Sequence, residues 1–357
     1  MKKLWSKRCQ SLTPYVPGEQ PRREKLIKLN TNENPYPPSP AVIEAIRTAA
    51  ADLRLYPDPT CEEVRTALAQ SLGVKPNQVF VGNGSDEVLS LAFCAFFDPD
   101  KPIRFADITY SFYPVFADFY GLRYEEIPLD ETFTLPVEPF LEPDYGVVLA
   151  NPNAPTGREM NFCDLRNIVE ADPNRVVIVD EAYVDFGARS AVELVNEFPN
   201  LLVVQTLSKS RALAGLRVGF AIGNENLIAA LNTVKDSFNS YPVDRLAQAG
   251  AVAAIRDREY FRLTVGKVRT TRSCTELALH DMGFTVCDSA ANFLFVSHKK
   301  LSAQKLLDEL RQRGILVRWW DKPRIRDYLR ITIGTEEEMK ALCEAMKEII
   351  GGTTDTE

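Results

Sequence analysis

The segment Thr206-Leu-Ser-Lys-Ser-Arg-Ala-Leu-Ala-Gly-Leu-Arg217 follows a β-rich run, Leu201-Leu-Val-Val-Gln, and places Lys209 just past the expected strand. A lone lysine is usually a solvated surface charge. Small and apolar residues flank this one, which favours a buried amine with a lowered pKa. Such an amine can form a Schiff base with an aldehyde, and the neighbouring hydroxyls of Thr206 and Ser208 and the closing guanidinium can hold a phosphate. The segment therefore predicts a pyridoxal phosphate site.

Strand-like and helix-like stretches alternate around this segment. Short β-branched runs lie at 79–81, 146–150, 176–179, 201–204 and 218–222, and helical patterns lie between them at 86–97, 110–120 and 161–171. Alternation of this kind predicts an α/β fold with a mostly parallel sheet covered by helices on both faces. Ligands bind at the carboxyl ends of the strands in such sheets.

The chain divides into three parts by pattern. A Pro-rich arm, residues 1–40, is expected to pack on the small domain and on a partner subunit, and helical patterns at 41–53 and 61–73 open a large domain, 41–245. A smaller α/β domain, 246–357, is expected to follow. Its predicted helices are 243–282, 302–313 and 336–350, and its strands are 284–286, 292–296, 315–318 and 329–333.

Composition excludes several classes of function. The net charge of −7 argues against a nucleic-acid surface. No apolar run reaches the length of a membrane span, and the basic start lacks the apolar region of a secretory signal. Seven cysteines without a C-x-x-C pair, and two histidines, His280 and His298, outside any metal-ligand spacing, predict reduced thiols, no metal site and a cytoplasmic location.

Two glycine- or proline-containing turns follow predicted strands. In Gly82-Asn-Gly-Ser-Asp-Glu87, the residues Gly84, Ser85 and Asp86 can form a phosphate cradle at a helix N-terminus, although a plain N-capped helix has the same pattern. The segment does not match G-x-G-x-x-G, which counts against a dinucleotide-binding dehydrogenase. The second turn, Asn151-Pro-Asn-Ala-Pro-Thr-Gly157, is rigid and can direct an amide side chain into a site, or be an ordinary turn.

The segment Asp180-Glu-Ala-Tyr183 comes directly after the run 176–179. A carboxylate at a strand end can keep a pyridine nitrogen protonated, and the cationic ring then draws electrons from a substrate carbanion. The phenol of Tyr183 could bond the ring's 3-oxygen. The alternative is an acidic pair that caps the next segment.

Together these segments resemble the fold type I pyridoxal-phosphate enzymes and, within them, the class II aminotransferases. The likeness is strongest to the histidinol-phosphate aminotransferase family and runs nearly end to end. It also includes Leu29-Asn-Thr-Asn-Glu-Asn-Pro35, Arg54-Leu-Tyr-Pro-Asp58 and Leu329-Arg-Ile-Thr-Ile-Gly334. The resemblance implies a large domain with a mostly parallel central sheet and a smaller α/β domain.

The resemblance also implies roles for single residues. Lys209 would bind the cofactor covalently and shuttle a proton, Asp180 would pair with the pyridine nitrogen, and Tyr183 would bond the ring oxygen. The residues implied around the cofactor are Tyr110 on the ring face, Ser85, Asp86, Thr206, Ser208 and Arg217 at the phosphate, and Tyr56 reaching the neighbouring subunit's phosphate. Those implied around the substrate are Arg330 and Arg318 on its anionic group and Tyr15 and Asn32 on the arm. Arg318 could equally be a surface strand residue.

One position departs from the family pattern. The asparagine that usually precedes Pro-Thr-Gly and bonds the 3-oxygen is replaced here by Ala154. Either Asn153 or Asn151 takes over that contact, or Tyr183 carries it alone, and we expect Asn153 to do so.

The resemblance implies a cytoplasmic homodimer that interconverts histidinol phosphate and 2-oxoglutarate with imidazole-acetol phosphate and glutamate. Two alternatives keep the cofactor, an aromatic amino-acid aminotransferase and a threonine-phosphate decarboxylase. A non-catalytic regulator with an aminotransferase-like domain is a more remote alternative, because such proteins carry an N-terminal DNA-binding module and this chain is acidic.

Overall fold

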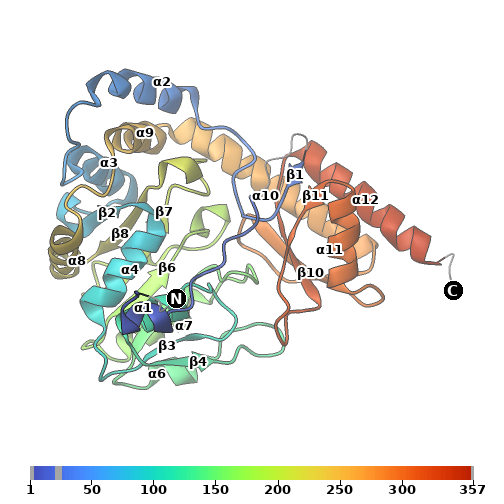
Figure 1. Ribbon diagram of the computed structural model, residues 1–357, viewed down its shortest axis with the longest axis horizontal. Helices are drawn as coiled ribbons and strands as arrows, with labels where there is room; N and C mark the ends of the chain where they lie inside the picture. Colours follow the sequence, from blue (N-terminus) through green and yellow to red (C-terminus); the bar gives the residue numbers. More distant parts are fainter. Residues whose placement is uncertain (1–3, 21–25, 355–357) are drawn as a thin grey trace.

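The computed structural model describes residues 4–20 and 26–354, so parts of the predicted arm (1–3 and 21–25) and the last three residues, 355–357, lie outside the described residues. A seven-stranded sheet in the order β2-β8-β7-β6-β5-β3-β4 forms the centre of a large lobe (Figure 1). Its strands are β2 (Val79–Gly82), β3 (Ile103–Ala106), β4 (Tyr124–Ile127), β5 (Gly146–Ala150), β6 (Val177–Asp180), β7 (Leu201–Thr206) and β8 (Gly219–Gly223). Strand β8 alone runs in the direction opposite to the other strands of this sheet. The mostly parallel α/β fold expected from the sequence is confirmed.

Helices cover both faces of the large sheet because successive strand residues are apolar and point to opposite faces. Along β7, Leu201 and Val203 pack into one apolar core, and Leu202 and Val204 pack into the other. The first core contains residues of α2 (Pro40–Ala49), α3 (Glu62–Leu72), α7 (Phe162–Glu170) and α9 (Arg245–Arg256). The second contains residues of α4 (Gly84–Phe96), α5 (Tyr113–Tyr120) and α8 (Glu225–Phe238). Short α6 (Glu138–Leu141) precedes β5.

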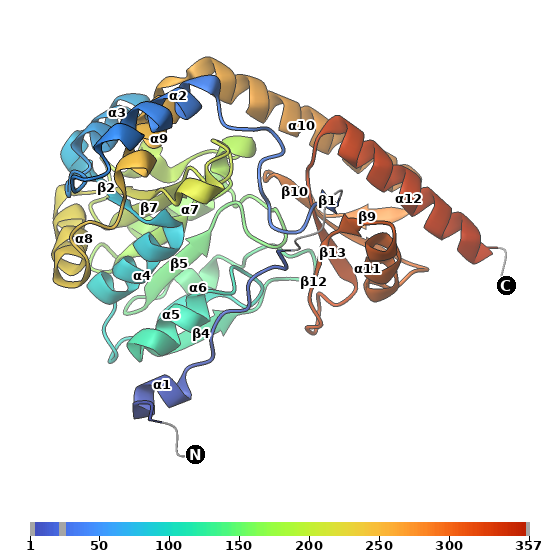
Figure 2. The same ribbon diagram turned by 45° about the horizontal axis from the view of Figure 1, so that its top comes forward.

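A four-stranded antiparallel sheet in the order β12-β13-β10-β9 forms a small lobe. Its strands are β9 (Phe284–Val286), β10 (Phe293–His298), β12 (Arg318–Trp319) and β13 (Tyr328–Thr332), and its helices are α10 (Arg258–Asp281), α11 (Ala303–Gln312) and α12 (Glu336–Thr354). Helix α10 runs from the large lobe to the small one (Figure 2). Among the described helices none is both long and apolar enough to cross a membrane.

The N-terminal arm passes over both lobes. It begins near the large lobe with α1 (Lys7–Ser11), where Arg8 donates to the Phe119 carbonyl, and then runs to the small lobe (Figure 2). There β1 (Ile27–Lys28) pairs in parallel with β11 (Ile315–Leu316). Residues 29–36 lie between the lobes, since Asn32 bonds to Thr332 of the small lobe and Asn34 bonds to the Lys209 backbone of the large lobe.

The structure corrects several predicted boundaries. The single helix expected over 243–282 is two helices separated at Asp257, whose side chain caps α10 by accepting from the Tyr260 N–H. Helix α9 packs in the core of the large lobe, so we propose that the domain boundary lies near Asp257 rather than at residue 245. The strand expected over 315–318 is divided between β11 and β12, which belong to different sheets.

Candidate active site

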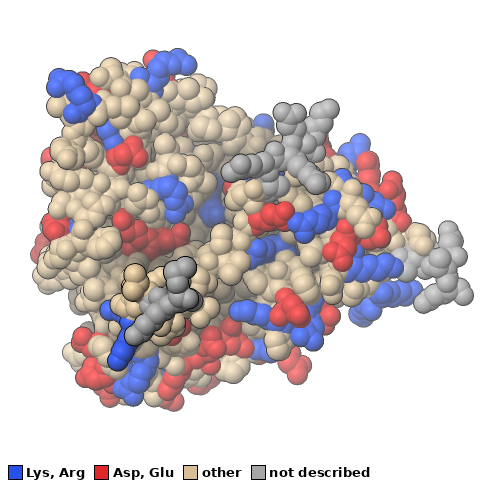
Figure 3. Space-filling view, in the orientation of Figure 1, with Lys and Arg blue, Asp and Glu red and all other residues tan. Residues whose placement is uncertain are grey.

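A cavity of about 430 Å³ lies between the lobes, at the edge of the large sheet where its parallel strands end. The space-filling view shows a hollow between the lobes with basic side chains visible in it (Figure 3). The residues expected at the site that line this cavity are Tyr15, Asn32, Ser85, Asp86, Tyr110, Asp180, Tyr183, Thr206, Ser208, Lys209, Arg217, Arg318 and Arg330. Segments far apart in sequence therefore meet where a parallel sheet is expected to bind its ligand.

Lys209 lies in the loop after β7 and extends its amine into the cavity. Its Nζ donates to the Thr31 carbonyl oxygen at 3.2 Å, and the Asn34 amide holds the Lys209 carbonyl oxygen at 2.9 Å. Burial, and after it the charge of Arg330, lower the pKa of the Lys209 amine to about 8. A useful fraction of this amine is therefore neutral near neutral pH, which is the form that attacks an aldehyde.

Asp180 ends β6 and is 5% exposed. The Tyr113 phenol donates to Asp180 Oδ2 at 2.9 Å, and the Ala182 backbone N–H donates to Oδ1 at 3.2 Å. Burial raises the pKa of Asp180 to about 6, although both hydrogen bonds act to lower it. No described cation forms a salt bridge with this carboxylate, so it is available to a positively charged ring nitrogen.

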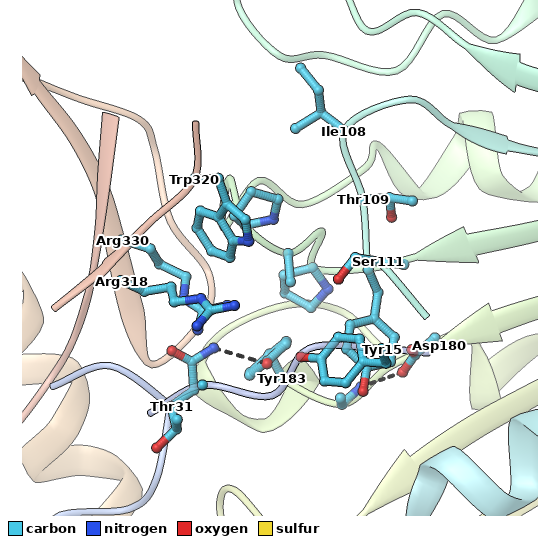
Figure 4. Close-up of a pocket in the computed structure, with 18 of the residues that line it drawn as sticks. Tyr15, Thr31, Ile108, Thr109, Ser111, Asp180, Tyr183, Arg318, Trp320 and Arg330 are labelled. Carbon is cyan, nitrogen blue, oxygen red and sulfur yellow. Dashed lines mark hydrogen bonds between the residues drawn. The ribbon is translucent and has the colours of Figure 1, made fainter. Parts of the chain in front are cut away.

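The phenol of Tyr183 lies on the small-lobe side of the cavity. It accepts a hydrogen bond from Asn32 Nδ2 at 2.9 Å, which Figure 4 draws, and its ring packs edge-on against Phe293 at 5.0 Å. Burial raises the pKa of Tyr183, while the Arg330 charge and the Asn32 hydrogen bond act in the opposite direction. The net shift is upward, so the phenol keeps its proton at neutral pH and remains a hydrogen-bond donor.

An anion cradle forms where α4 begins. The N-cap residue Asn83 makes no side-chain cap bond to this helix, so N–H groups of the first turn remain available. A Cβ on Gly84 would lie 2.4 Å from Arg217 Nη2, and one on Gly219 would lie 2.2 Å from the Ser85 backbone nitrogen. The two glycines therefore let the guanidinium and β8 approach the helix N-terminus closely. Thr206 and Ser208 add hydroxyls that are 2.9 Å apart. This donor set fits a phosphate ester.

Asp86 holds two other site residues in place. Its Oδ1 accepts from the Tyr110 phenol at 2.7 Å, and its Oδ2 lies 3.2 Å from Arg217 Nη2. Because both carboxylate oxygens are engaged, and because a carboxylate repels a phosphate, we assign the Asp86 side chain to orienting Tyr110 and Arg217. Tyr15 of the arm stacks on Phe112 at 4.4 Å and closes this side of the cavity.

Two arginines face the cavity from the small lobe (Figure 4). Arg318 of β12 and Arg330 of β13 are paired in register, so their side chains lie on the same face of the sheet. Both guanidiniums lie beside the Trp320 ring, at 5.2 and 5.1 Å from its centre. Burial and the nearby Arg318 lower the pKa of Arg330. Arg330 Nε is buried and has no hydrogen-bond partner among the described residues, and no described carboxylate forms a salt bridge with either guanidinium. An anion bound in the cavity would accept hydrogen bonds from both guanidiniums and balance their charge.

The comparisons with known proteins agree with this geometry. The profile of the family described as aminotransferase class I and II matches residues 24–346. The chain belongs to this aminotransferase family. The histidinol-phosphate aminotransferase 1 of Hydrogenovibrio crunogenus is 54% identical over 351 residues, covering 98% of this chain and 99% of that protein. The histidinol-phosphate aminotransferase of Aromatoleum aromaticum is 54% identical over 355 residues, covering 98% and 100%.

A solved structure supports the same conclusion. The histidinol-phosphate aminotransferase from Sinorhizobium meliloti, determined in complex with pyridoxal-5'-phosphate, matches this aminotransferase with a TM-score of 0.89 and 26% identity, covering 99% of each chain. The fold class and the aminotransferase activity expected from the sequence are confirmed.

Three residues expected at the site do not line its cavity in this aminotransferase. The prediction for Asn153 is corrected, because its amide donates to the Ile108 carbonyl at 2.9 Å and to Thr156 Oγ1 at 3.0 Å, and its side chain faces a second cavity of about 220 Å³ behind the turn. Gly84 lies beneath Arg217 rather than at the surface of the cavity. Tyr56 is 79% exposed and lies outside the cavity within this single chain.

Four site residues were missed by the sequence reading. They are Asn34, Tyr113, Trp320 and Thr332, which contact Lys209, Asp180, the arginine pair and Asn32. A signal existed for Tyr113 alone, because it lies three residues after Tyr110, and the two rings pack against each other at 5.7 Å. Asn34 and Thr332 depend on contacts of the arm with the two lobes, and Trp320 depends on the pairing of β12 with β13, none of which local patterns reveal.

Proposed function

We propose that this aminotransferase transfers the amino group of histidinol phosphate to 2-oxoglutarate, with pyridoxal phosphate as cofactor, and yields imidazole-acetol phosphate and glutamate in a ping-pong reaction. The names of the relatives support this substrate. The observation that carries it in the structure is the pair of cavity-facing guanidiniums without a carboxylate partner among the described residues. A phosphate monoester carries about −1.5 to −2 charge near neutral pH, which matches two cations better than a single carboxylate does.

The residues of the cavity fit the cofactor. Lys209 would hold it covalently, Asp180 would face its ring nitrogen, and Tyr183 would donate to its 3-oxygen. Ser85, Thr206, Ser208, Arg217 and the N–H groups that begin α4 would hold the phosphate, and Tyr110 would lie against the ring. When bound, pyridoxal phosphate supplies an aldehyde that takes up the amino group and a ring that withdraws electrons from the reacting carbon.

The protein residues then have separate tasks. Arg318 and Arg330 bind the substrate phosphate and thereby place the amine near Lys209. Tyr15 and the arm segment 30–34 cover the cavity and exclude water. With the cofactor bound, Lys209 would be the base in place to take a proton from the substrate carbon that bears the amino group, and the acid that gives it back. Its lowered pKa suits both halves of this transfer.

Removing either arginine tests the phosphate assignment. Arg330→Ala and Arg318→Ala are each expected to reduce kcat/KM for histidinol phosphate by about 10²-fold, because each loses a charge-assisted interaction with the anion. Arg318→Ala should reduce turnover of phenylalanine much less, since a carboxylate needs only one of the two guanidiniums. Arg326→Ala is a matched control, because Arg326 lies between these residues in sequence but pairs with Asp321 outside the cavity. Equal losses with both substrates would contradict the assignment.

A substrate panel separates the reactions that the fold could support. Purified enzyme is incubated with histidinol phosphate, phenylalanine or threonine phosphate, and the keto product and carbon dioxide are measured. We expect transamination of histidinol phosphate at the highest kcat/KM, without carbon dioxide release. Preference for phenylalanine would indicate an aromatic amino-acid aminotransferase, and carbon dioxide from threonine phosphate would indicate a decarboxylase.

We propose that the enzyme is a homodimer with a shared site. Apolar side chains are exposed where the segment after α2 meets the end of α8: Tyr56 is 79% exposed and Phe238 81%, and Tyr56 stacks on Tyr241 at 4.9 Å. Exposed apolar patches of this kind commonly form subunit contacts. Tyr56 would then reach the phosphate in the partner's cavity. A monomeric mass in sedimentation at micromolar concentration would contradict this proposal.

The cytoplasmic location also stays a proposal. The seven cysteines are all free thiols, and four of them are exposed. Exposed thiols persist most readily where the surroundings are reducing.

A further inference from the structure

We propose that Asn32, held by Thr332, directs the phenolic hydrogen of Tyr183 into the cavity, so that Tyr183 supplies the contact with the cofactor 3-oxygen without help from the Asn151–Gly157 turn. The inference rests on the proposed function, because it concerns the oxygen that pyridoxal phosphate brings to the site. It assigns Asn32 as a positioning residue for the phenol, where the sequence suggested only that it closes over the substrate.

The hydrogen-bond network fixes which way the Asn32 amide faces. The Asn32 backbone N–H donates to Thr332 Oγ1 at 2.9 Å, so the hydroxyl uses a lone pair there and keeps its own hydrogen to donate. Asn32 Oδ1 lies 3.0 Å from Thr332 Oγ1 and accepts that hydrogen. The reversed amide would leave the buried Thr332 hydroxyl hydrogen without an acceptor among the described residues, so Nδ2 faces Tyr183 Oη, which lies 2.9 Å away.

This amide orientation decides the direction of the phenolic hydrogen. The Tyr183 oxygen accepts from Asn32, so its own hydrogen cannot point at the amide and is directed elsewhere. Tyr183 Oη has no other hydrogen-bond partner among the described residues, and the phenol faces the cavity. The hydrogen is therefore free for an acceptor that enters the cavity, such as a negatively charged ring oxygen.

Asn32 is built rigidly into this position. It is 1% exposed, and the Asn292 amide holds its carbonyl oxygen at 3.0 Å. Its backbone has φ of 57°, in the left-handed region that asparagine and glycine tolerate best. Thr332 is 2% exposed on β13. A buried and fully bonded pair of this kind has little freedom, so it can define the direction of a single hydrogen.

The turn that contains Ala154 offers no side-chain donor to the cofactor 3-oxygen, which leaves Tyr183 as the donor. Ala154 is buried in an apolar cluster with Ala291 and Phe293, and Tyr183 packs on that cluster. Neither asparagine of the turn can substitute, because the Asn153 amide donates to Ile108 and Thr156, and Asn151 and Asn153 both line the second cavity rather than this one. Tyr183 is therefore the side chain in place to donate to the 3-oxygen.

The same strand carries the substrate-binding arginine. Arg330 and Thr332 are two residues apart on β13, so their side chains project from the same face of the strand toward the arm and the cavity. Arg330 also donates from Nη2 to the Asn30 carbonyl at 3.0 Å. The position of the anion-binding guanidinium and the direction of the Tyr183 hydrogen are thus set by one strand and one arm segment.

The test is a pH titration of the visible absorbance of the bound cofactor in the substrate-free holoenzyme. A hydrogen bond to the 3-oxygen stabilises its negative charge and so favours loss of the nearby proton that the absorbance reports. Asn32→Gly removes the amide while tolerating the left-handed backbone, and we expect it to raise the titration midpoint by about one pH unit. Tyr183→Phe is expected to raise the midpoint at least as much, and the double variant no further.

Thr332 supplies a second, independent pair of variants. Thr332→Val keeps the shape of the side chain but loses the hydroxyl, and we expect it to raise the titration midpoint as Asn32→Gly does. Thr332→Ser keeps the hydroxyl and should restore the wild-type value. The charged groups that face the phenol, Arg330, Asp180, Asp86 and Lys209, are unchanged in all of these variants.

The outcomes separate this inference from the proposed function. An unshifted midpoint in Asn32→Gly, or an equal shift produced by Asn32→Gly in the Tyr183→Phe background, would overturn the inference while leaving the proposed function standing. Loss of the visible band in the wild-type protein itself would overturn the proposed function. Should Asn32→Gly fail to fold, the comparison of Thr332→Val with Thr332→Ser decides, and equal midpoints in those two variants would overturn the inference.

Discussion

Replacing Lys209 with alanine is expected to lower kcat by about 10⁴-fold, because one side chain supplies both the covalent attachment and the proton transfer. The measurement is the single-turnover rate with histidinol phosphate. A small primary amine added to the Lys209→Ala enzyme should restore part of the rate, since it can enter the cavity and carry the proton in place of Nζ. A variant that retains more than about a tenth of the wild-type rate would contradict the role.

The same substitution has an expected effect on the stability of the apoprotein. The pKa of Lys209 is about 8 in the folded protein and 10.5 in the unfolded chain. Burying the protonated amine therefore lowers the free energy of unfolding. This loss is fully present below pH 8 and disappears as the pH rises toward 10.5. Lys209→Ala should therefore lose activity without a matching loss of thermal stability at about pH 7. Lys235→Met is a control for the loss of a buried lysine outside the cavity, where Lys235 bonds to the Pro59 carbonyl and pairs with Asp236.

The second large effect is expected at Asp180. Asp180→Asn keeps the size of the side chain but removes the charge opposite the ring nitrogen, and kcat should fall by about 10³-fold, as for the loss of a preorganised electrostatic group. Added amines should not restore this loss, which separates it from that of Lys209→Ala. The measurement is again the single-turnover rate. Activity within about tenfold of wild type would show that the carboxylate does not act on the cofactor.

Apoprotein stability should change in the opposite direction to activity. Burial raises the pKa of Asp180 from 3.8 to about 6. Because the pKa of this carboxyl group is higher in the folded protein, the free energy of unfolding falls as the pH rises from about 4 to about 6. Above that range the folded protein bears the full cost of the buried charge. Asparagine avoids the penalty but loses one hydrogen bond, so the variant should be more stable at about pH 8 by about 1–2 kcal/mol. The advantage of the variant should disappear below about pH 4, where Asp180 is neutral in the folded and the unfolded state, and thermal melts across pH would detect this.

Glu181 offers a matched control for this experiment. It adjoins Asp180 and is similarly buried, and burial raises its pKa to about 7. Its oxygens accept from Ser190, the Ala191 N–H and Gln205, and it does not line the cavity. Glu181→Gln should change stability while leaving kcat within about threefold of wild type, because this buried side chain does not touch the reacting atoms.

The parts of the fold that the sequence predicted are those with strong local patterns. Strand β7 is a run of buried apolar residues next to a turn, so its pattern alone identifies it. Strands β3 and β4 were missed because polar residues interrupt them. Arg104 lies buried in β3 and pairs with Glu125 of β4 at 2.8 Å, a contact that compensates its charge only after the two strands have come together. The break at Asp257 is set by a cap that a helical pattern does not reveal.

The predicted site residues that line the cavity are likewise those that a local pattern identifies. Lys209, Asp180 and Tyr183 each end or follow a strand, so topology alone brings them to one edge of the sheet. Asn153 was placed incorrectly because the direction of a turn side chain depends on its hydrogen-bond partners, here Ile108 and Thr156. The assignment of Asn32 as a positioning residue needed Thr332, which lies 300 residues away in sequence.

Lys209 is the amine that we expect to hold the cofactor in this cavity. Reduction of the holoenzyme with borohydride, followed by proteolysis and mass spectrometry, tests it most directly, because reduction makes the carbon–nitrogen bond permanent. We expect one pyridoxyl-phosphate adduct per chain, on the peptide that contains Lys209. An adduct on another lysine, or none in a protein that retains its visible absorbance, would contradict it.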